Sequence, residues 1–267
     1  MFLIYNSDVI TEDEFRLPIN DRAFQYGDGI FETIRYENNH LWFWPDHMDR
    51  LTAGMAALRL RAPTQLTSST IQQLVFQLLS ANKLLDQPAR IKLQIWRKPG
   101  GLYTPSSQEI NYLISARPGL SFAITQQSKI AVYDLVRLSE SPFSACKTLN
   151  SLPYVLAGLH KQERELNDVI LLSTEGYLAE CVASNLFWFK NETLFTPSLK
   201  TGCINGIARR QLLRHFTTHQ EGFFLPAELD EAKVVFAANV MGIQVFRGEW
   251  SAAHADRIRQ LFMDISV

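Results

Sequence analysis

The amino-acid sequence predicts an α+β fold with two domains. Strand-like segments occur in clusters, mixed with helices but without the strict alternation of a doubly wound sheet. A proline and a glycine, Pro118-Gly119, also interrupt the 267 residues before their midpoint, and this pair disfavours helix and is typical of a connection. We therefore expect an N-terminal domain over residues 1–116, a linker over 117–120 and a C-terminal domain over 121–267.

In the first half, apolar periodicity predicts strands and two helices. Gly29–Tyr36 is strand-like, and Pro45–Leu60 carries apolar residues at helical spacing. A second helical stripe spans Ile71–Leu79. Residues 91–95 alternate like a half-buried strand, and residues 112–115 supply another strand. This half should form its own core.

The second half again mixes both kinds of element. Strands are predicted at residues 130–138, 169–172, 183–189, 194–196 and 234–238. Helices are predicted at Leu152–Leu166, from Asn205-Gly206 through Phe216, and at Ala253–Phe262. Glu175-Gly176 and Asn191–Thr193 are typical of turns between strands.

Composition and charge favour small-molecule partners. The chain is 46% apolar and 20% charged, which is typical of a folded soluble protein. Its 26 Lys and Arg against 27 Asp and Glu give a net charge of -1, so no overall positive charge favours nucleic acid or an anionic membrane. The amino terminus lacks the pattern of a signal peptide, and no apolar run approaches the roughly 20 residues of a membrane span. We expect a cytoplasmic protein.

The cysteines predict neither disulfides nor a metal site. Cys146, Cys181 and Cys203 are odd in number, lie far apart and show no ligand spacing. They should be reduced, buried thiols, and no metal is expected.

A glycine-rich segment resembles a nucleotide-binding fingerprint only in part. Gly27-Asp28-Gly29 begins like GxGxxG, but Glu32 occupies the third glycine position and no clear strand precedes it. We therefore favour a turn that leads into a strand. Common phosphate-loop, metalloprotease and serine-hydrolase motifs are absent from the sequence.

Three features carry candidate chemistry. Lys147 lies among small and apolar residues, where a lowered pKa would make its amine a nucleophile, although most lysines are surface charges. Glu180 lies in an apolar run, and a buried carboxylate needs a donor or a cation, although an exposed acid at a strand start is equally compatible. Asn205-Gly206 opens a helix whose free N–H groups can bind phosphate.

In combination these features resemble one family, the fold-type IV pyridoxal-phosphate enzymes. The resemblance extends from about residue 20 to 245. It is carried by residues 26–35, 47–51, 147–150, 180–187 and 205–209. That family includes branched-chain aminotransferases, D-amino-acid aminotransferases and aminodeoxychorismate lyases. It implies a two-domain fold of the D-amino-acid aminotransferase kind.

The resemblance implies that Lys147 carries pyridoxal 5'-phosphate as a Schiff base and moves protons at the substrate Cα. Glu180 would keep the ring nitrogen of the cofactor protonated. Replacement of Lys147 should therefore abolish turnover, and removal of Glu180 should weaken the cofactor as an electron sink.

The resemblance also implies a phosphate site. Arg50 would bind the phosphate through its guanidinium fork. Ile207 and Ala208 would supply backbone N–H groups at a helix start, and Asn239 a side-chain contact. His47 stays outside this set, since a lone histidine at a helix start is more often a surface residue.

Three further residues are expected on the substrate side of the pocket. Tyr26 and Phe31 match family positions that line it, although Phe31 is also compatible with ordinary core packing. Arg97 is a candidate for binding a substrate carboxylate, or a surface arginine with a buried stem. The family also implies a homodimer.

The resemblance leaves two reactions open. Family breadth favours an aminotransferase that moves an amino group between an amino acid and a 2-oxo acid. The alternative is an aminodeoxychorismate lyase that releases pyruvate and forms 4-aminobenzoate, which Lys147–Asn150 and Glu180-Cys181 resemble more closely. The loop Gly100–Tyr103 lacks an arginine that such lyases commonly place there.

Overall fold

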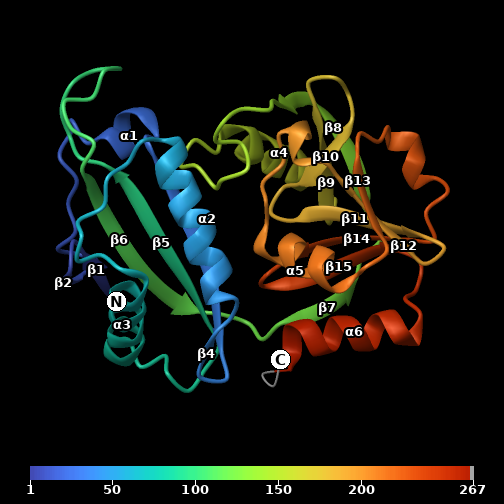
Figure 1. Ribbon diagram of the computed structural model, residues 1–267, viewed down its shortest axis with the longest axis horizontal. Coiled ribbons are helices and arrows are strands. Elements are labelled where there is room, and N and C mark those ends of the chain that lie inside the picture. Colours follow the sequence, from blue (N-terminus) through green and yellow to red (C-terminus); the bar gives the residue numbers. More distant parts are fainter. Residues whose placement is uncertain (265–267) are drawn as a thin grey trace. The chain divides into compact units, whose positions relative to one another are not determined.

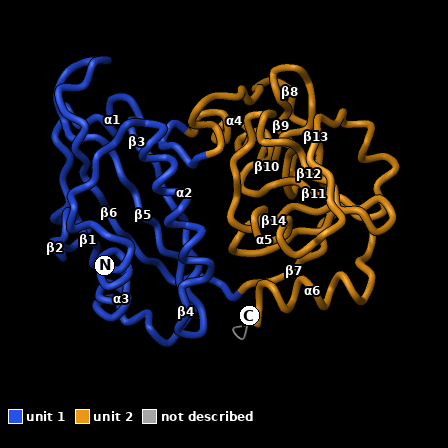
Figure 2. The backbone as a smooth tube through the Cα atoms, viewed as in Figure 1, with its two compact units in different colours: residues 1–121, 146–150 blue, residues 122–145, 151–267 orange. Residues whose placement is uncertain are grey.

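The computed structural model describes residues 1–264, and contacts divide the chain into two compact units (Figure 2). Unit 1 comprises Met1–Ser121 and Cys146–Asn150, and unit 2 comprises Phe122–Ala145 and Ser151–Val267. The division after residue 121 lies close to the expected linker. The segment that carries Lys147 differs from our expectation, because its contacts group it with unit 1 rather than with the second half of the chain.

Unit 1 contains an antiparallel sheet with the strand order β2-β1-β6-β5-β3-β4 (Figure 1). Its strands are β1 (Phe2–Tyr5), β2 (Asp8–Thr11), β3 (Gly29–Glu37), β4 (His40–Leu41), β5 (Ala89–Arg97) and β6 (Ile110–Pro118), and its helices are α1 (Arg22–Tyr26), α2 (Trp44–Ala57) and α3 (Ser68–Ala81). Side chains such as Ile34 and Leu93 from the sheet pack with Leu51 and Val75 from α2 and α3 in one apolar cluster. The opposite face of β3 and β5 therefore carries Phe31 and Lys92, because side chains alternate along a strand.

Unit 2 contains a mixed sheet with the path β7-β15-β14-β11-β10-β9-β8, to which β12 and β13 are added beside β11. Its strands are β7 (Ala123–Gln126), β8 (Ile130–Leu138), β9 (Asp168–Ser173), β10 (Leu178–Cys181), β11 (Asn185–Lys190), β12 (Thr193–Pro197), β13 (His219–Gly222), β14 (Val234–Asn239) and β15 (Gly242–Arg247). Its helices are α4 (Leu152–Glu163), α5 (Ile207–His215) and α6 (Ala252–Met263), with short 3-10 turns at Leu199–Thr201 and Pro226–Leu229. Every residue of β9 and β10 is buried, so the loops that follow them start from a rigid base.

The predicted α+β class and its predicted helices and long strands are confirmed, with shifted ends. Helix α2 stops at Ala57 rather than at Leu60, because Arg59 adopts a left-handed φ of 55°. Arg117 and Pro118, expected in the linker, instead pair with β5 as the last residues of β6. Proline is tolerated at such a strand end because it needs no donor there.

Candidate active site

The predicted site residues fall into two groups, one in each unit. Unit 1 holds Tyr26, Phe31, Arg50, Arg97 and Lys147, and unit 2 holds Glu180, Ile207, Ala208 and Asn239. Each group is described within its own unit.

The segment around Lys147 is joined to the start of β3 by backbone hydrogen bonds. Phe31 N donates to Lys147 O at 2.8 Å, and Leu149 N donates to Gly29 O at 2.9 Å. The Lys147 ammonium nitrogen lies 5.1 Å from the centre of the Phe31 ring. Gly29 permits this close approach, because a Cβ there would lie 2.6 Å from Trp96 Cβ and 2.8 Å from Leu149 Cδ1. The glycine-rich segment is thus a turn that leads into a strand.

Arg50 is held by a buried carboxylate that the sequence analysis left without a role. Glu32 accepts from Arg50 Nε at 2.8 Å and from Arg50 Nη2 at 2.5 Å. His47 Nδ1 lies 2.6 Å from the same carboxylate, and all three side chains are buried. His47 therefore braces Arg50 through Glu32 and is not a surface residue.

The electrostatics of this cluster keep Glu32 ionised. Burial opposes its charge, but the Arg50 charge and the His47 hydrogen bond outweigh it and lower the pKa of Glu32 to about 2. Burial also lowers the pKa of His47 despite the neighbouring acid. A neutral His47 that donates from Nδ1 to Glu32 is consistent with the ionised carboxylate and with the lowered pKa of the histidine.

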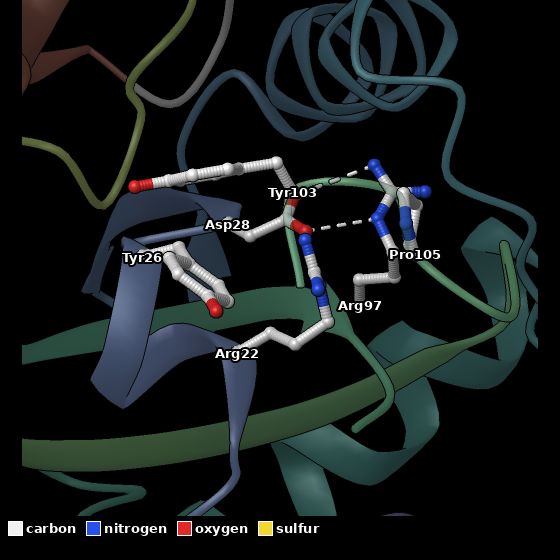
Figure 3. A pocket seen from close by; sticks show the side chains of 6 residues that line it. All are labelled: Arg22, Tyr26, Asp28, Arg97, Tyr103 and Pro105. Atoms are coloured by element: carbon white, nitrogen blue, oxygen red, sulfur yellow. Dashed lines mark hydrogen bonds and ion pairs between the residues drawn. The ribbon is translucent and has the colours of Figure 1, made fainter. Parts of the chain in front are cut away.

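Tyr26 and Arg97 line one cavity of unit 1, with a volume of about 390 Å³ (Figure 3). The structure thus brings together two of the residues expected on the substrate side. The complete lining is Arg22, Tyr26, Asp28, Arg97, Tyr103 and Pro105.

The guanidinium group of Arg97 is held by the protein on every nitrogen. Nε donates to Asp28 Oδ2 at 2.9 Å, and Nη2 donates to Asp28 Oδ1 at 3.3 Å and to Leu58 O at 2.6 Å. Nη1 donates to Arg59 O at 3.3 Å and to Gln108 Oε1. Since a guanidinium group has five N–H donors, all five are engaged. Arg97 therefore has a structural role, and its binding of a substrate carboxylate stays a prediction.

Asp28 also holds a second arginine of the same cavity. Arg22 Nε donates to Asp28 Oδ2 at 2.7 Å, and its guanidinium carbon lies 4.8 Å from the centre of the Tyr26 ring. Burial would raise the pKa of Asp28, but the hydrogen bonds and charges of Arg97 and Arg22 hold it below its usual value. One ionised carboxylate therefore fixes two cations beside Tyr26.

Glu180 lies buried in β10 of unit 2, with an exposed fraction of 3%. Three uncharged groups donate to it: Tyr154 Oη at 2.7 Å, Ile204 N at 3.0 Å and Asn185 Nδ2 at 3.1 Å. Burial and the adjacent Glu180 charge raise the pKa of the Tyr154 phenol, which therefore stays a donor. Glu180 is therefore a buried carboxylate and not an exposed acid at the start of a strand.

The start of α5 is coupled to Glu180 through Asn185. Asn185 Nδ2 also donates to Ile204 O at 2.8 Å, two residues before the helix cap Gly206. A Cβ on Gly206 would lie 2.0 Å from Asn185 Oδ1, so only glycine fits beside this amide. Ile207 and Ala208 follow as the first helical residues, where N–H groups lack partners within the helix. The start of α5 therefore lies next to the hydrogen-bond network of Glu180.

Asn239 stands at the end of β14 and binds the turn between β10 and β11. Its Nδ2 donates to Ala183 O at 3.0 Å and to Ser184 Oγ at 2.9 Å. Its Oδ1 accepts from Met241 N at 2.7 Å. The side chain therefore positions the Ala183-Ser184 turn, and its predicted phosphate contact is untested.

Sequence reasoning missed the partners that hold the predicted residues. Glu32 was detectable, because it alternates with core residues of β3, and a carboxylate at a core position needs a partner. Tyr154 and Asn185 gave no such signal, since only the fold brings them to Glu180. The three cysteines are free and buried as expected.

The described part of the chain offers no cluster of three or more metal-ligating acids, histidines or cysteines. Over residues 1–264, no helix has the length and apolar character of a membrane span.

Comparisons with known proteins agree with this chemistry. The profile of the family described as amino-transferase class IV matches residues 29–246. The aminodeoxychorismate lyase of Vibrio harveyi is 28% identical over 251 residues, which cover 87% of each chain. The D-alanine aminotransferase of Listeria monocytogenes serotype 4b is 24% identical over 285 residues, covering 99% of this chain and 96% of that protein.

A solved structure shares the fold over nearly the whole chain. The branched-chain amino acid aminotransferase of Escherichia coli aligns with a TM-score of 0.86 at 22% identity, covering 98% of this chain and 93% of that one. Pyridoxal phosphate is the cofactor of this group of enzymes. Because the family profile covers more than half of its length, the chain belongs to the class IV aminotransferase family.

Proposed function

We propose that this protein is a pyridoxal-phosphate-dependent aminotransferase in which Lys147 holds the cofactor covalently and Glu180 binds its ring nitrogen. When bound, pyridoxal phosphate supplies an electron sink for the electrons left at the substrate Cα. Glu180 is a buried carboxylate that accepts hydrogen bonds from Tyr154, Asn185 and Ile204, and such an acceptor suits a cationic ring N–H as a donor. The residues of this chain therefore fit the cofactor.

One observation carries the proposal: within unit 2, the residues that flank the Lys147 segment in the sequence bind the hydrogen-bond network of Glu180. Ala145 O, two residues before Lys147, accepts from Asn205 N at 3.0 Å, next to the residue whose N–H binds Glu180. Seven residues after Lys147, Tyr154 donates directly to Glu180. The chain therefore contributes to the Glu180 network both shortly before and shortly after Lys147 in the sequence.

Lys147 would move the proton in the reaction. Its amine would take the proton from the substrate Cα and would pass it on to the cofactor carbon, acting as base and then as acid. The Phe31 ring lies beside this ammonium group, with its centre 5.1 Å from the nitrogen. Tyr26, in the cavity with Arg22, would line the substrate path.

The phosphate of the cofactor would be bound by backbone N–H groups at the start of α5 and by Arg50. Ile207 and Ala208 present N–H groups at the start of α5. Arg50, which Glu32 holds through Nε and Nη2, is the side chain that would bind the phosphate. Asn239 would support the phosphate through the turn that it holds.

A direct test is borohydride reduction of the purified yellow protein followed by peptide mapping. We expect a phosphopyridoxyl tag on Lys147 and no turnover in Lys147→Ala. Lys129→Ala is the matched control, because Lys129 is exposed. Absence of a tag on Lys147 would refute the proposal.

The lyase is the second candidate, favoured by the 28% identity to the Vibrio harveyi lyase. A panel of L- and D-amino acids, followed by aminodeoxychorismate, separates the two reactions. Conversion of the cofactor to its pyridoxamine form by an amino acid supports transamination. Pyruvate release from aminodeoxychorismate without that conversion supports the lyase.

We also propose a cytoplasmic homodimer. Three free, buried thiols suit a reducing compartment. Light scattering coupled to size-exclusion chromatography tests the dimer, and a monomeric active enzyme would contradict it.

A further inference from the structure

Tyr154 is the hydroxyl among the three donors to Glu180 described above. Its Oη lies 2.7 Å from Glu180 Oε1, whereas Ile204 N lies 3.0 Å from the same oxygen. Asn185 Nδ2 binds the other oxygen, Oε2, at 3.1 Å. A short hydrogen bond from a hydroxyl to an ionised carboxylate is among the stronger hydrogen bonds in proteins. Of these three donors, the phenol is therefore the one that lies closest to the Glu180 charge.

The position of the phenol is fixed by the start of α4. Tyr154 lies in the first turn of this helix, directly after Pro153, whose ring restricts the backbone. The tyrosine packs against an apolar cluster that includes Ala157, Val169 and Ala179. The side chain therefore has little freedom to turn its Oη away from Glu180.

The phenol and a neighbouring thiol both keep their protons at neutral pH. Burial raises the pKa of the Tyr154 phenol, and the Glu180 charge raises it further. Burial also raises the pKa of Cys203 to about 12. The contact between Tyr154 and Glu180 is therefore an O–H group that donates to a carboxylate.

A donor to a carboxylate lowers the affinity of that carboxylate for a proton, because the hydrogen bond stabilises the charged form. In the proposed site, Glu180 and the ring nitrogen of the cofactor share one proton. A less basic carboxylate leaves this proton on the nitrogen, and a cationic ring is the better electron sink. The strength of the Tyr154 hydrogen bond therefore affects the chemistry at the substrate Cα.

We propose that Tyr154 is a positioning residue that keeps the shared proton on the ring nitrogen by donating to Glu180 Oε1. The inference rests on the proposed function, since it takes Glu180 as the partner of the ring. Without the phenol, Asn185 and Ile204 still hold the carboxylate, but its proton affinity rises and the proton moves toward the acid. Because Tyr154 follows Lys147 by seven residues, one short stretch of chain supplies both the reacting amine and the group that adjusts the electron demand of the cofactor.

The test compares Tyr154→Phe with the wild type and with Tyr133→Phe, a control from the same apolar cluster. Each holoenzyme is loaded with pyridoxal phosphate that carries ¹⁵N in its ring, because the chemical shift of this nitrogen reports its protonation. We expect Tyr154→Phe to move the signal toward that of the neutral ring and to lower kcat by on the order of 10- to 100-fold. The KM for the amino substrate and the retention of cofactor after dialysis should stay unchanged, and Tyr133→Phe should match the wild type.

A second variant strengthens the donor instead of removing it. Incorporation of 3-fluorotyrosine at position 154 keeps the ring and its packing, but the electron-withdrawing fluorine makes the phenol a stronger donor. The ring-nitrogen signal should then move further from the neutral value, opposite to its movement in Tyr154→Phe. This variant tests the inference by itself if the phenylalanine variant does not fold.

Two results would overturn the inference. One is a folded Tyr154→Phe enzyme whose ring-nitrogen signal equals that of the wild type. The other is a 3-fluorotyrosine enzyme whose signal stays unchanged or moves toward the neutral ring, which would indicate an effect of packing alone. Failure of the proposed function is distinguishable, because it would appear as a missing tag on Lys147 in the wild type.

Discussion

At the scale of single residues, Glu32 determines whether Arg50 can be held in place. Its carboxylate joins the arginine and His47 in a buried cluster, and each partner depends on the other two. Removing one member of a buried ion pair leaves an unbalanced charge, at a cost of about 3 to 5 kcal/mol. The stability of unit 1 should therefore depend on pH and on the presence of Glu32.

We predict that Glu32→Gln lowers the free energy of unfolding of unit 1 by about 3 kcal/mol at pH 7. The pKa of the carboxyl is lowered from 4.5 to about 2. Its stabilisation is therefore present above the ordinary pKa and is lost as pH falls toward 2. Urea unfolding at several pH values checks this, with exposed Asp49→Asn on the same helix as control. A stability difference that persists unchanged at pH 2 would contradict it.

We predict that Glu180→Gln loses turnover by at least about 100-fold, because a glutamine cannot keep the ring nitrogen protonated. Borohydride should still tag Lys147 in this variant, since the lysine is unchanged. Single-turnover absorbance measurements with an amino acid check the loss. Glu175→Gln, at an exposed turn, serves as control, and a variant that retains full rate would refute the role of Glu180.

At the scale of elements, α5 begins where it does because Gly206 leaves room for Asn185. The amide then reaches both Glu180 and the Ile204 carbonyl. The start of the helix and the buried acid are thus parts of one hydrogen-bond network.

We predict that Gly206→Ala weakens retention of the cofactor by about 10-fold or more, since displacing Asn185 costs at least one buried hydrogen bond. The loss is measured as cofactor absorbance after dialysis. Gly158→Ala in α4 is the matched control, because nothing lies within 4 Å of its added Cβ. That control should keep the cofactor and gain up to about 1 kcal/mol of helix stability.

The sequence predicted the long elements well and the short ones poorly. Periodicity identified β8 and α3 because nine and 14 residues give a clear pattern. It missed β1 and β2, whose four residues each are joined by Asn6 and Ser7 in left-handed conformations. Strand propensity is a weak signal in so short a segment, and the pairing of β1 with β6 decides whether the strand forms.

The candidate residues followed from motifs, but their partners did not. Glu180 and Lys147 were named from their neighbours in the sequence and from family resemblance. Tyr154 lies 26 positions from Glu180, and no local pattern links the two. Hydrogen-bond networks between distant segments become visible only once the fold fixes them.

At the scale of the whole molecule, burial protects the thiols. Burial raises the pKa of Cys203 to about 12, and it raises the pKa of Cys181 as well. We predict that Ellman's reagent leaves both unmodified in the native protein and labels all three cysteines after unfolding, because the thiolate is the reactive form. Rapid native labelling of Cys181 or Cys203 would contradict the buried positions.

The five residues from Cys146 to Asn150 have one further consequence. They complete the hydrogen bonding of Gly29 and Phe31, although 24 residues of unit 2 separate them in the sequence from the rest of unit 1. A gene fragment that ends at residue 121 would therefore encode a sheet with an open edge at its glycine turn, prone to pair with other chains. Unit 1 is therefore not one continuous stretch of the chain, and engineers who wish to exchange halves between relatives must transfer this short segment together with the sheet that it completes.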